Sequence, residues 1–259
     1  MHIYDDRFPA SPTATLRPPT ATVNDYRALQ ARLGTKRTVI VTPSTYGTDN
    51  RCLLDALAQF GPDARGIAVV DASVSSGELK RLSDAGVRGI RFNLAVGAVT
   101  TVEMIEPLAK RVHDLGWHIQ INMPPDQLIA NEGLLQRVPT PIVFDHMARV
   151  PVEMSPQREA VLVVVRRAVE SGRAWVKLTA PYLGSKSGPP TYQDAGLVVA
   201  DLVKLNPERM LWGTDWPHPT HQKHLPDDAV LVDGFVEWVP DQAQRRRILV
   251  ENPKRLYRF

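Results

Sequence analysis

The sequence has little cysteine and no long apolar run. Its one cysteine, Cys52, excludes an internal disulfide and fits a reducing compartment. No stretch approaches the roughly 20 apolar residues that a membrane helix needs, and the N-terminus lacks the charged-then-apolar pattern of a signal peptide. We therefore expect a cytoplasmic protein with no membrane partner.

An excess of one charge is also missing. The net charge is +3 over 259 residues, and the arginine runs at 166–167 and 245–247 fall in helical segments, where they are typical of a solvated helix face. Nucleic-acid binding would need a basic stripe with stacking aromatic residues, and the sequence has none. We expect no nucleic-acid partner, whereas a small anionic substrate remains compatible with this charge.

What the sequence does have is a regular alternation of short Val- and Ile-rich runs with longer amphipathic segments, which is typical of βαβ units. The eight predicted strands are His2–Asp5, Thr38–Thr42, Gly66–Val70, Gly89–Asn93, His118–Met123, Pro141–Asp145, Ala174–Thr179 and Met210–Thr214. Helices are predicted over Asp25–Leu33, Asn50–Phe60, Ser76–Ala85, Thr101–Leu115, Pro156–Glu170 and Gln242–Val250.

This count predicts an α/β fold, a (β/α)₈ TIM barrel that forms a single domain over residues 1–259. A doubly wound open sheet is the alternative, but no G-x-G-x-x-G or P-loop fingerprint supports it. Two long connections, 6–22 and 181–192, are predicted to shape a substrate pocket at one face of the barrel.

Polar side chains gather where the predicted strands end, which is the face that carries the active sites of such barrels. The last strand leads into Asp215, and Pro217 then prevents the ladder from continuing. His2 and His146 belong to the first and sixth strands, so these three side chains could converge on one site. The other candidates are Tyr46, Arg91, Asn122, Arg149, Lys177, Tyr182 and His218. Two other acidic residues at strand ends, Asp71 and Asp145, have a simpler interpretation, since capping of the helices that follow would be enough to explain them.

Four motifs carry a family resemblance. The segments Gly-Thr-Asp-Trp-Pro-His-Pro at 213–219 and Phe-Asp-His-Met-Ala-Arg at 144–149 resemble the amidohydrolase superfamily. Pro-Ser-Thr-Tyr-Gly-Thr-Asp-Asn at 43–50 and Arg-Gly-Ile-Arg-Phe-Asn at 88–93 narrow the resemblance to the branch of 2-pyrone-4,6-dicarboxylate lactonase, sugar-acid lactonases and D-galactarolactone isomerase. The resemblance implies a hydrolase that opens the cyclic ester of a small carboxylated lactone, of sugar-acid or pyrone-dicarboxylate type. The alternatives are an isomerase that moves the ester of a galactarolactone and, outside the enzymes, a barrel that only binds a small acid.

On this basis Asp215 is the expected general base, and His146 and His2 are expected to polarise the lactone carbonyl. Arg91 and Arg149 are expected to hold substrate carboxylates. The remaining candidates would bind or orient the ring: Tyr46, Asn122, Lys177, Tyr182 and His218. The pyrone relative has a further arginine just after the Arg91 position, whereas the stretch 94–98 has no cation here. This difference favours a substrate with one carboxylate or many hydroxyls.

The superfamily normally opens with a His-x-His pair on strand one, and His2 matches its second histidine. The numbered chain thus begins inside the motif, either because its start is truncated or because the protein lacks one site histidine. One zinc ion could be held by His2, His146 and Asp215, but the strand-five position carries Asn122 or Gln120, and neutral amides are poor zinc ligands. We therefore expect no required cofactor, with one zinc ion as the alternative. The spacing His218-x-x-His221-x-x-His224 is a second, weaker metal candidate, and the oligomeric state is not predicted.

Overall fold

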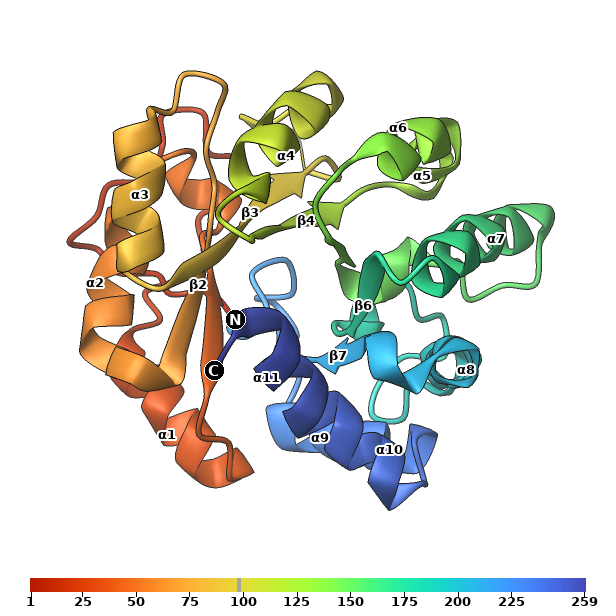
Figure 1. Ribbon diagram of the computed structural model, residues 1–259. Helices are drawn as coiled ribbons and strands as arrows, with labels where there is room; N and C mark the ends of the chain where they lie inside the picture. The colour runs from red at the N-terminus through yellow and green to blue at the C-terminus, as the bar shows by residue number, and fades with distance from the viewer. Residues whose placement is uncertain (97–98) are drawn as a thin grey trace.

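The computed structural model describes residues 1–96 and 99–259. Its centre is a parallel sheet of seven strands, which pair in the order in which they occur along the chain. Figure 1 shows this sheet curled about a central axis with most helices outside it. The strands are β1 (Thr38–Val41), β2 (Ala64–Ala68), β3 (Val87–Asn93), β4 (His118–Asn122), β5 (Ile142–Phe144), β6 (Ala174–Leu178) and β7 (Met210–Trp212).

Helices connect the strands, and all but α11 at the end of the chain lie outside the sheet in Figure 1. They are α1 (Val23–Leu33), α2 (Arg51–Phe60), α3 (Ser76–Asp84), α4 (Ile105–His113), α5 (Pro125–Ala130), α6 (Glu132–Arg137), α7 (Pro156–Glu170), α8 (Gln193–Leu205), α9 (Asp228–Trp238), α10 (Gln242–Arg246) and α11 (Asn252–Tyr257). No helix in the described part of the chain is long and apolar enough to cross a membrane.

The strands are buried on both faces, as expected for a parallel sheet covered by helices. In β4 all five residues are buried, and apolar Ile119 and Ile121 alternate with polar side chains at 118, 120 and 122. Because neighbouring side chains in a strand point to opposite faces, the isoleucines face the helices and the polar residues face the axis. This one five-residue strand thus contributes apolar side chains to the core outside the sheet and polar side chains to the interior of the sheet.

The lower part of the interior is apolar. Five of its buried side chains come from the strands and one from α11: Val41, Ile67, Val143, Trp175, Leu211 and Tyr257. Figure 1 shows α11 lying against the centre of the ring, beside the N-terminus. This layer supports the polar residues at the opposite, carboxyl end of the strands.

The first of the eight predicted strands, His2–Asp5, is not confirmed. Tyr4 forms only an isolated antiparallel bridge with Ala21. Met1 and His2 nevertheless lie between β1 and the segment after β7, because the Val41 amide donates to the Met1 carbonyl at 2.9 Å and the His2 amide donates to the Trp216 carbonyl at 2.8 Å. The chain leaves this position after two residues, which is too short for a regular strand.

Helix starts and ends follow local capping. The predicted helix at Asp25 begins two residues earlier, because the Thr22 side chain and the N3 residue Asp25 form a capping box. Pro107 falls in the first turn of α4, where its missing amide hydrogen costs nothing. In place of the single predicted helix Thr101–Leu115, the structure has a short 3₁₀ turn over Val102–Met104 followed by α4. The last predicted helix, Gln242–Val250, consists of α10 and most of a π-helical turn over Arg247–Glu251, and α11 follows beyond its predicted end.

Candidate active site

Six of the ten predicted site residues line one small hollow at the carboxyl end of the sheet, which we call the mouth hollow. They are His2, Arg91, Asn122, His146, Arg149 and Asp215. The volume of the hollow is about 40 Å³, and its lining also includes the apolar side chains of Leu16, Val96 and Leu183, which we call its apolar rim. The structure therefore brings together the N-terminal segment, strands β3 and β4, and the segments that follow β5 and β7.

The turn after β5 has an unusual backbone. His146, Met147, Ala148 and Arg149 all have φ between 49° and 55°, so four consecutive L-residues adopt the left-handed conformation. Each such residue is disfavoured by roughly 1–2 kcal/mol, and strain of this kind is typical of functional sites. We call this segment the left-handed turn. It carries two of the predicted site residues, His146 and Arg149, at its two ends.

Asp215 and His2 face one another across the hollow. The His2 Nδ1 atom lies 2.8 Å from the Val41 carbonyl oxygen, and because a carbonyl can only accept, Nδ1 carries the hydrogen. Burial lowers the pKa of His2, so its Nε2 presents a lone pair. This atom lies 3.7 Å from Asp215 Oδ1, a separation too long for a direct hydrogen bond. Two acceptor atoms therefore face the same space.

The Asp215 carboxylate is held in its ionised form. Burial by itself would favour the neutral acid, but His146 and His2, which gain positive charge at the low pH where a carboxyl would titrate, and the hydrogen bond from Tyr182 outweigh it and keep the pKa of Asp215 well below its ordinary value. Asp215 also has a left-handed backbone, with φ of 61°. A buried, ionised carboxylate with one oxygen facing the hollow is suited to accept a proton.

His146 is buried as well, and burial lowers its pKa to about 4. Its Nδ1 lies 3.0 Å from the Thr179 hydroxyl, which leaves Nε2 for the hollow. At neutral pH this imidazole is uncharged, so it can take part in hydrogen bonding or proton transfer without first losing a proton.

A buried charge cluster lies beneath the hollow. Asp145 Oδ2 accepts from Arg91 Nε and from the Gln120 amide, both at 3.0 Å. Lys177 Nζ lies 3.3 Å from Asp145 Oδ1 and donates to Gln120 at 2.5 Å. Burial by itself would raise the pKa of Asp145, but the two cations lower it. The carboxylate fixes the Arg91 guanidinium by one edge, which leaves the terminal nitrogens directed elsewhere.

Arg149 is fixed in a similar way. Its Nε donates to Asn122 Oδ1 at 2.9 Å. The Asn122 amide in turn donates to Asn93 Oδ1 at 2.9 Å, and the Asn93 amide donates to the Ser44 hydroxyl at 2.8 Å. Asn122, the residue predicted at strand five and found at the end of β4, thus already uses its side-chain oxygen to accept from the Arg149 guanidinium.

Four predicted residues lie outside the lining of the mouth hollow. The Tyr46 hydroxyl accepts from the Asp5 amide at 2.9 Å, and Lys177 belongs to the charge cluster. Tyr182 donates to Asp215 Oδ2 at 2.7 Å and lies 3.0 Å from His218 Nδ1. These two side chains are therefore behind Asp215.

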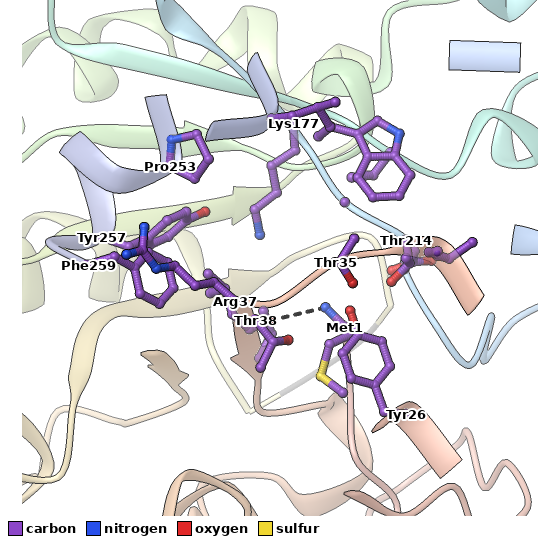
Figure 2. A pocket seen from close by; sticks show the side chains of 18 of the residues that line it. Met1, Tyr26, Thr35, Arg37, Thr38, Lys177, Thr214, Pro253, Tyr257 and Phe259 are labelled. Carbon is purple, nitrogen blue, oxygen red and sulfur yellow. Dashed lines mark hydrogen bonds between the residues drawn. The ribbon is translucent and has the colours of Figure 1, made fainter. Parts of the chain in front are cut away.

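A second and larger cavity, of about 610 Å³, lies on the inner side of the same residues and extends to the amino end of the strands. We call it the lower cavity. Figure 2 shows the Lys177 amine pointing into it, opposite Thr38 and Met1, with Tyr257 and Phe259 at one side. The Met1 nitrogen donates to the Val39 carbonyl at 3.2 Å. Both cavities share His2, Arg91, His146 and Asp215, so these side chains separate the two spaces.

A catalytic zinc needs three or four protein ligands, and within the described ranges no group of three or more His, Cys, Asp or Glu side chains is placed to hold a metal ion. The chemistry of the donors also fits such an ion poorly. The Asn122 oxygen already accepts from Arg149, and a second cation, Arg91, lies in the same lining. His218 has both ring nitrogens engaged by Tyr182 and Asp228, so the His218-x-x-His221-x-x-His224 spacing does not present three free imidazoles.

Asp145 differs from its sequence interpretation, and Asp228 is not among the residues predicted from the sequence. Asp145 is a possible helix cap by its sequence, yet it makes no cap hydrogen bond and anchors Arg91 instead. Asp228, which contacts His218, has no predicted role. A signal for Asp145 exists, since it directly precedes His146 after an apolar strand and faces Arg91, Gln120 and Lys177 from neighbouring strands.

Comparison with known proteins gives a consistent result. The sequence profile of the amidohydrolase family matches residues 1–259. The 2-pyrone-4,6-dicarboxylate hydrolase of Comamonas testosteroni is 36% identical over 99% of this chain and 88% of that protein. The 4-sulfomuconolactone hydrolase of Rhizobium radiobacter is 34% identical, with 99% and 88% covered. D-galactarolactone isomerase of Agrobacterium fabrum is 30% identical, with 100% and 89% covered. A solved apo structure from Agrobacterium tumefaciens superposes with a TM-score of 0.90 at 28% identity, covering 100% of this chain and 93% of that one.

Proposed function

The chain belongs to the amidohydrolase family, and from this premise we propose that it is an enzyme that opens the cyclic ester of a small carboxylated lactone. The observation that carries the proposal is the mouth hollow, where an ionised carboxylate, two uncharged imidazoles and two arginines line one space. General-base chemistry needs the ionised carboxylate, and recognition of an acid group on the substrate needs the arginines.

Three relatives support the substrate class. Their names specify a pyrone dicarboxylate, a sulfomuconolactone and a galactarolactone, and each of these is a cyclic ester that bears an acid group. The shared chemistry, a lactone ring with an anionic substituent, is what we assign to this chain. The stretch 94–98 lacks the additional cation expected for a dicarboxylate, although Gly97 and Ala98 lie outside the described residues.

We assign the nucleophile to the space between His2 and Asp215. The His2 Nε2 lone pair and Asp215 Oδ1 are both acceptors, so a water molecule can donate one hydrogen to each. Asp215 then takes the proton as the water oxygen attacks the ester carbonyl. This assignment places His2 on the nucleophile rather than on the carbonyl, and it leaves His146 Nε2 to act on the carbonyl or leaving oxygen.

Arg91 and Arg149 would bind the acid group of the substrate. Each guanidinium is held by its Nε, on Asp145 and on Asn122 respectively, and this arrangement presents the terminal nitrogens to a carboxylate. Tyr46 and Lys177 would support the site indirectly, since Tyr46 holds the backbone of Asp5 and Lys177 holds Asp145.

Substrate binding requires a local opening. A volume of about 40 Å³ has room for only a few water molecules, which is too small for a lactone ring. The apolar rim residues Leu16, Val96 and Leu183 are the side chains that would have to shift. We expect ring binding to displace them outward from Asp215.

Isomerisation is the second candidate, because one relative is a D-galactarolactone isomerase. If a substrate hydroxyl occupies the place of the water, Asp215 takes its proton and the ester moves from one oxygen to another. The same residues serve both reactions, so the identity of the nucleophile decides between them.

We also propose that no metal ion is required, on the basis of the donor set described above, with one zinc ion held by His2, His146 and Asp215 as the alternative. We further propose that residues 1–259 form one domain and that Met1 and His2 occupy the position of an eighth strand. The hydrogen bonds of these two residues to β1 and to Trp216 support this last assignment.

Proton NMR of candidate lactones incubated with chelator-treated protein tests the proposal. An open-chain acid establishes hydrolysis, and a second lactone establishes isomerisation. A reaction that appears only after zinc is added contradicts metal independence. If none of a panel of sugar-acid lactones, muconolactones and pyrone dicarboxylates changes, with or without zinc, the proposed function is wrong.

A further inference from the structure

A row of hydrogen bonds extends away from Asp215 on the side opposite the mouth hollow. Tyr182 Oη lies 2.7 Å from Asp215 Oδ2 and 3.0 Å from His218 Nδ1. His218 Nε2 then lies 3.2 Å from Asp228 Oδ2. We call Tyr182, His218 and Asp228 the supporting chain.

Three separate elements supply these residues. Tyr182 comes from the 3₁₀ turn Pro181–Leu183 after β6, His218 from the loop after β7, and Asp228 from the first turn of α9. All three side chains are buried, with 8%, 2% and 6% of their surfaces exposed. A polar group buried to this degree is costly unless it is hydrogen-bonded, so a continuous polar row across three elements calls for an explanation beyond packing.

The hydrogen positions in the chain follow from counting donors. Asp215 is ionised, so Tyr182 must donate its only hydrogen to Asp215 Oδ2. The Tyr182 oxygen can then only accept from the other side, which requires the hydrogen of that contact to be on His218 Nδ1. The contact between His218 Nε2 and Asp228 needs a third hydrogen, so this pair is either an imidazolium with a carboxylate or a neutral imidazole with a carboxylic acid. A hydrogen on His218 Nδ1 therefore requires the Tyr182 hydroxyl to donate to Asp215.

We propose that His218, held by Asp228, is a positioning residue that directs the Tyr182 hydroxyl onto Asp215 and so keeps Oδ1 of that carboxylate turned to the reacting water. Without the Nδ1 hydrogen, the Tyr182 hydroxyl can turn to His218, and Asp215 loses the donor that fixes it. Neither Tyr182 nor His218 touches the substrate in this scheme. The inference rests on the proposed role of Asp215 as general base.

A double-mutant cycle tests the effect on turnover. We expect H218L and Y182F each to lower kcat about tenfold, the share that one hydrogen bond to a charged group supplies, with KM nearly unchanged. In the Y182F background, H218L should have no further effect, because His218 acts only through the tyrosine hydroxyl. H218N is the matched control: its side-chain nitrogen replaces Nδ1 as a donor, and it should restore most of the lost kcat.

Equal effects of H218L in both backgrounds would overturn the inference, as would failure of H218N to restore kcat in a variant that is folded by circular dichroism. A readout without substrate separates this inference from the proposed function. In ¹⁵N NMR of the histidine rings, His218 Nδ1 should carry a hydrogen in the unsubstituted protein and lose it in part in D228A. An Nδ1 without hydrogen in the unsubstituted protein contradicts the inference, whatever the enzyme turns over. If the NMR result is as expected and no lactone reacts, the proposed function fails while the hydrogen-bond direction stands.

Discussion

The two sides of the mouth hollow hold charge in different ways. On one side Arg91, Asn93 and Asn122 project from the regular strands β3 and β4, and each is fixed by a side-chain partner. On the other side His146 and Asp215 lie on loop residues with φ of 49° and 61°. The strands therefore provide one guanidinium and the amide groups, whereas His146 and Asp215, which can exchange protons, lie on a strained backbone that also carries Arg149.

This contrast indicates a division of labour. A guanidinium stays charged across the working range of pH, so it can sit on a rigid strand and serve for recognition. A proton acceptor must approach a reacting atom closely and at a set angle, and a turn at the strand end can direct it there. We refer to the two sides as the recognition side and the proton side, and we count Arg149 with the recognition side because its guanidinium is fixed by Asn122 of β4.

The largest expected effect is on the proton side. Asp215→Asn removes the acceptor while preserving the shape of the side chain, so we expect kcat to fall by about 10³-fold or more. Steady-state kinetics on the identified lactone measures this. Asp71→Asn is the matched control, since the Asp71 carboxylate follows β2 but, among the described residues, accepts hydrogen bonds from nearby Ser73 alone. If Asp215→Asn leaves kcat within threefold, or Asp71→Asn matches its loss, Asp215 is not the general base.

On the recognition side we expect a loss of affinity instead. Arg149→Met should raise KM by about 10- to 100-fold, because a hydrogen-bonded charge pair with the substrate is lost, and should change kcat much less. Arg149→Lys separates charge from geometry, since an ammonium cannot bind a carboxylate with two parallel hydrogen bonds. A change in kcat with KM unaltered would show that Arg149 acts in proton transfer, and it would contradict the assignment of recognition and proton transfer to separate sides of the hollow.

The pH dependence of activity and that of stability should diverge. The pKa values of Asp215 and His146 lie below the ordinary range for their types, His146 at about 4, so kcat/KM should be nearly flat between pH 7 and 5. An acid limb centred near pH 6.5 would show that a histidine with an ordinary pKa controls the reaction.

Stability should fall in that same window. An unfolded histidine takes a proton below about pH 6.5, whereas folded His146 stays neutral until about pH 4 and folded His118 until about pH 3. The unfolded state then binds more protons, so the free energy of unfolding decreases as the pH falls. We expect a loss on the order of 2 kcal/mol per histidine by pH 5, measured by urea unfolding. The buried carboxylates act only at lower pH, since their folded pKa values are depressed. An equal loss in His146→Gln would assign the effect to other groups.

The smallest effect concerns the left-handed turn. Ala148 has φ of 54°, a conformation that glycine adopts without the steric penalty of a Cβ atom. Ala148→Gly should therefore raise the free energy of unfolding by up to about 1 kcal/mol. Thermal unfolding measures it, and Ala56→Gly in the middle of α2 is a control that should destabilise. Destabilisation by both substitutions would show that the turn is not strained at this position.

Much of the recognition side could be predicted from the sequence. Regular strands have a side-chain period of two, so the spacing of Arg91 and Asn93, or of Gln120 and Asn122, places them inside the sheet from the pattern alone. The strand-end motifs at 144–149 and 213–219 likewise point to His146 and Asp215 through their residue types and their positions after apolar strands. Six of the predicted residues do line the hollow.

The remainder could not be predicted, for physical reasons that differ between residues. Tyr182 and His218 come from connections whose backbone conformation has no periodic signal, so the sequence does not show that they lie behind Asp215. Helices α8 and α9 are missing from the predicted set because glycine and β-branched residues in Gln193–Leu205 and Asp228–Trp238 weaken the local helix preference, and packing against the sheet compensates. The strand over His2–Asp5 is predicted from its apolar character, whereas Tyr4 pairs with Ala21 instead.

The left-handed turn also has a consequence for the order in which the protein assembles. Four adjacent residues that each disfavour their native backbone by roughly 1–2 kcal/mol do not adopt it in an isolated segment. The turn can form only after its anchors exist, and those include the pairing of β5 with β6 and the contact of His146 with Thr179. A nascent chain would thus complete its strands before it acquires a reactive centre. A partly folded molecule of this protein is expected to have Arg91, Asn93 and Asn122 in place on their strands and to lack catalytic activity.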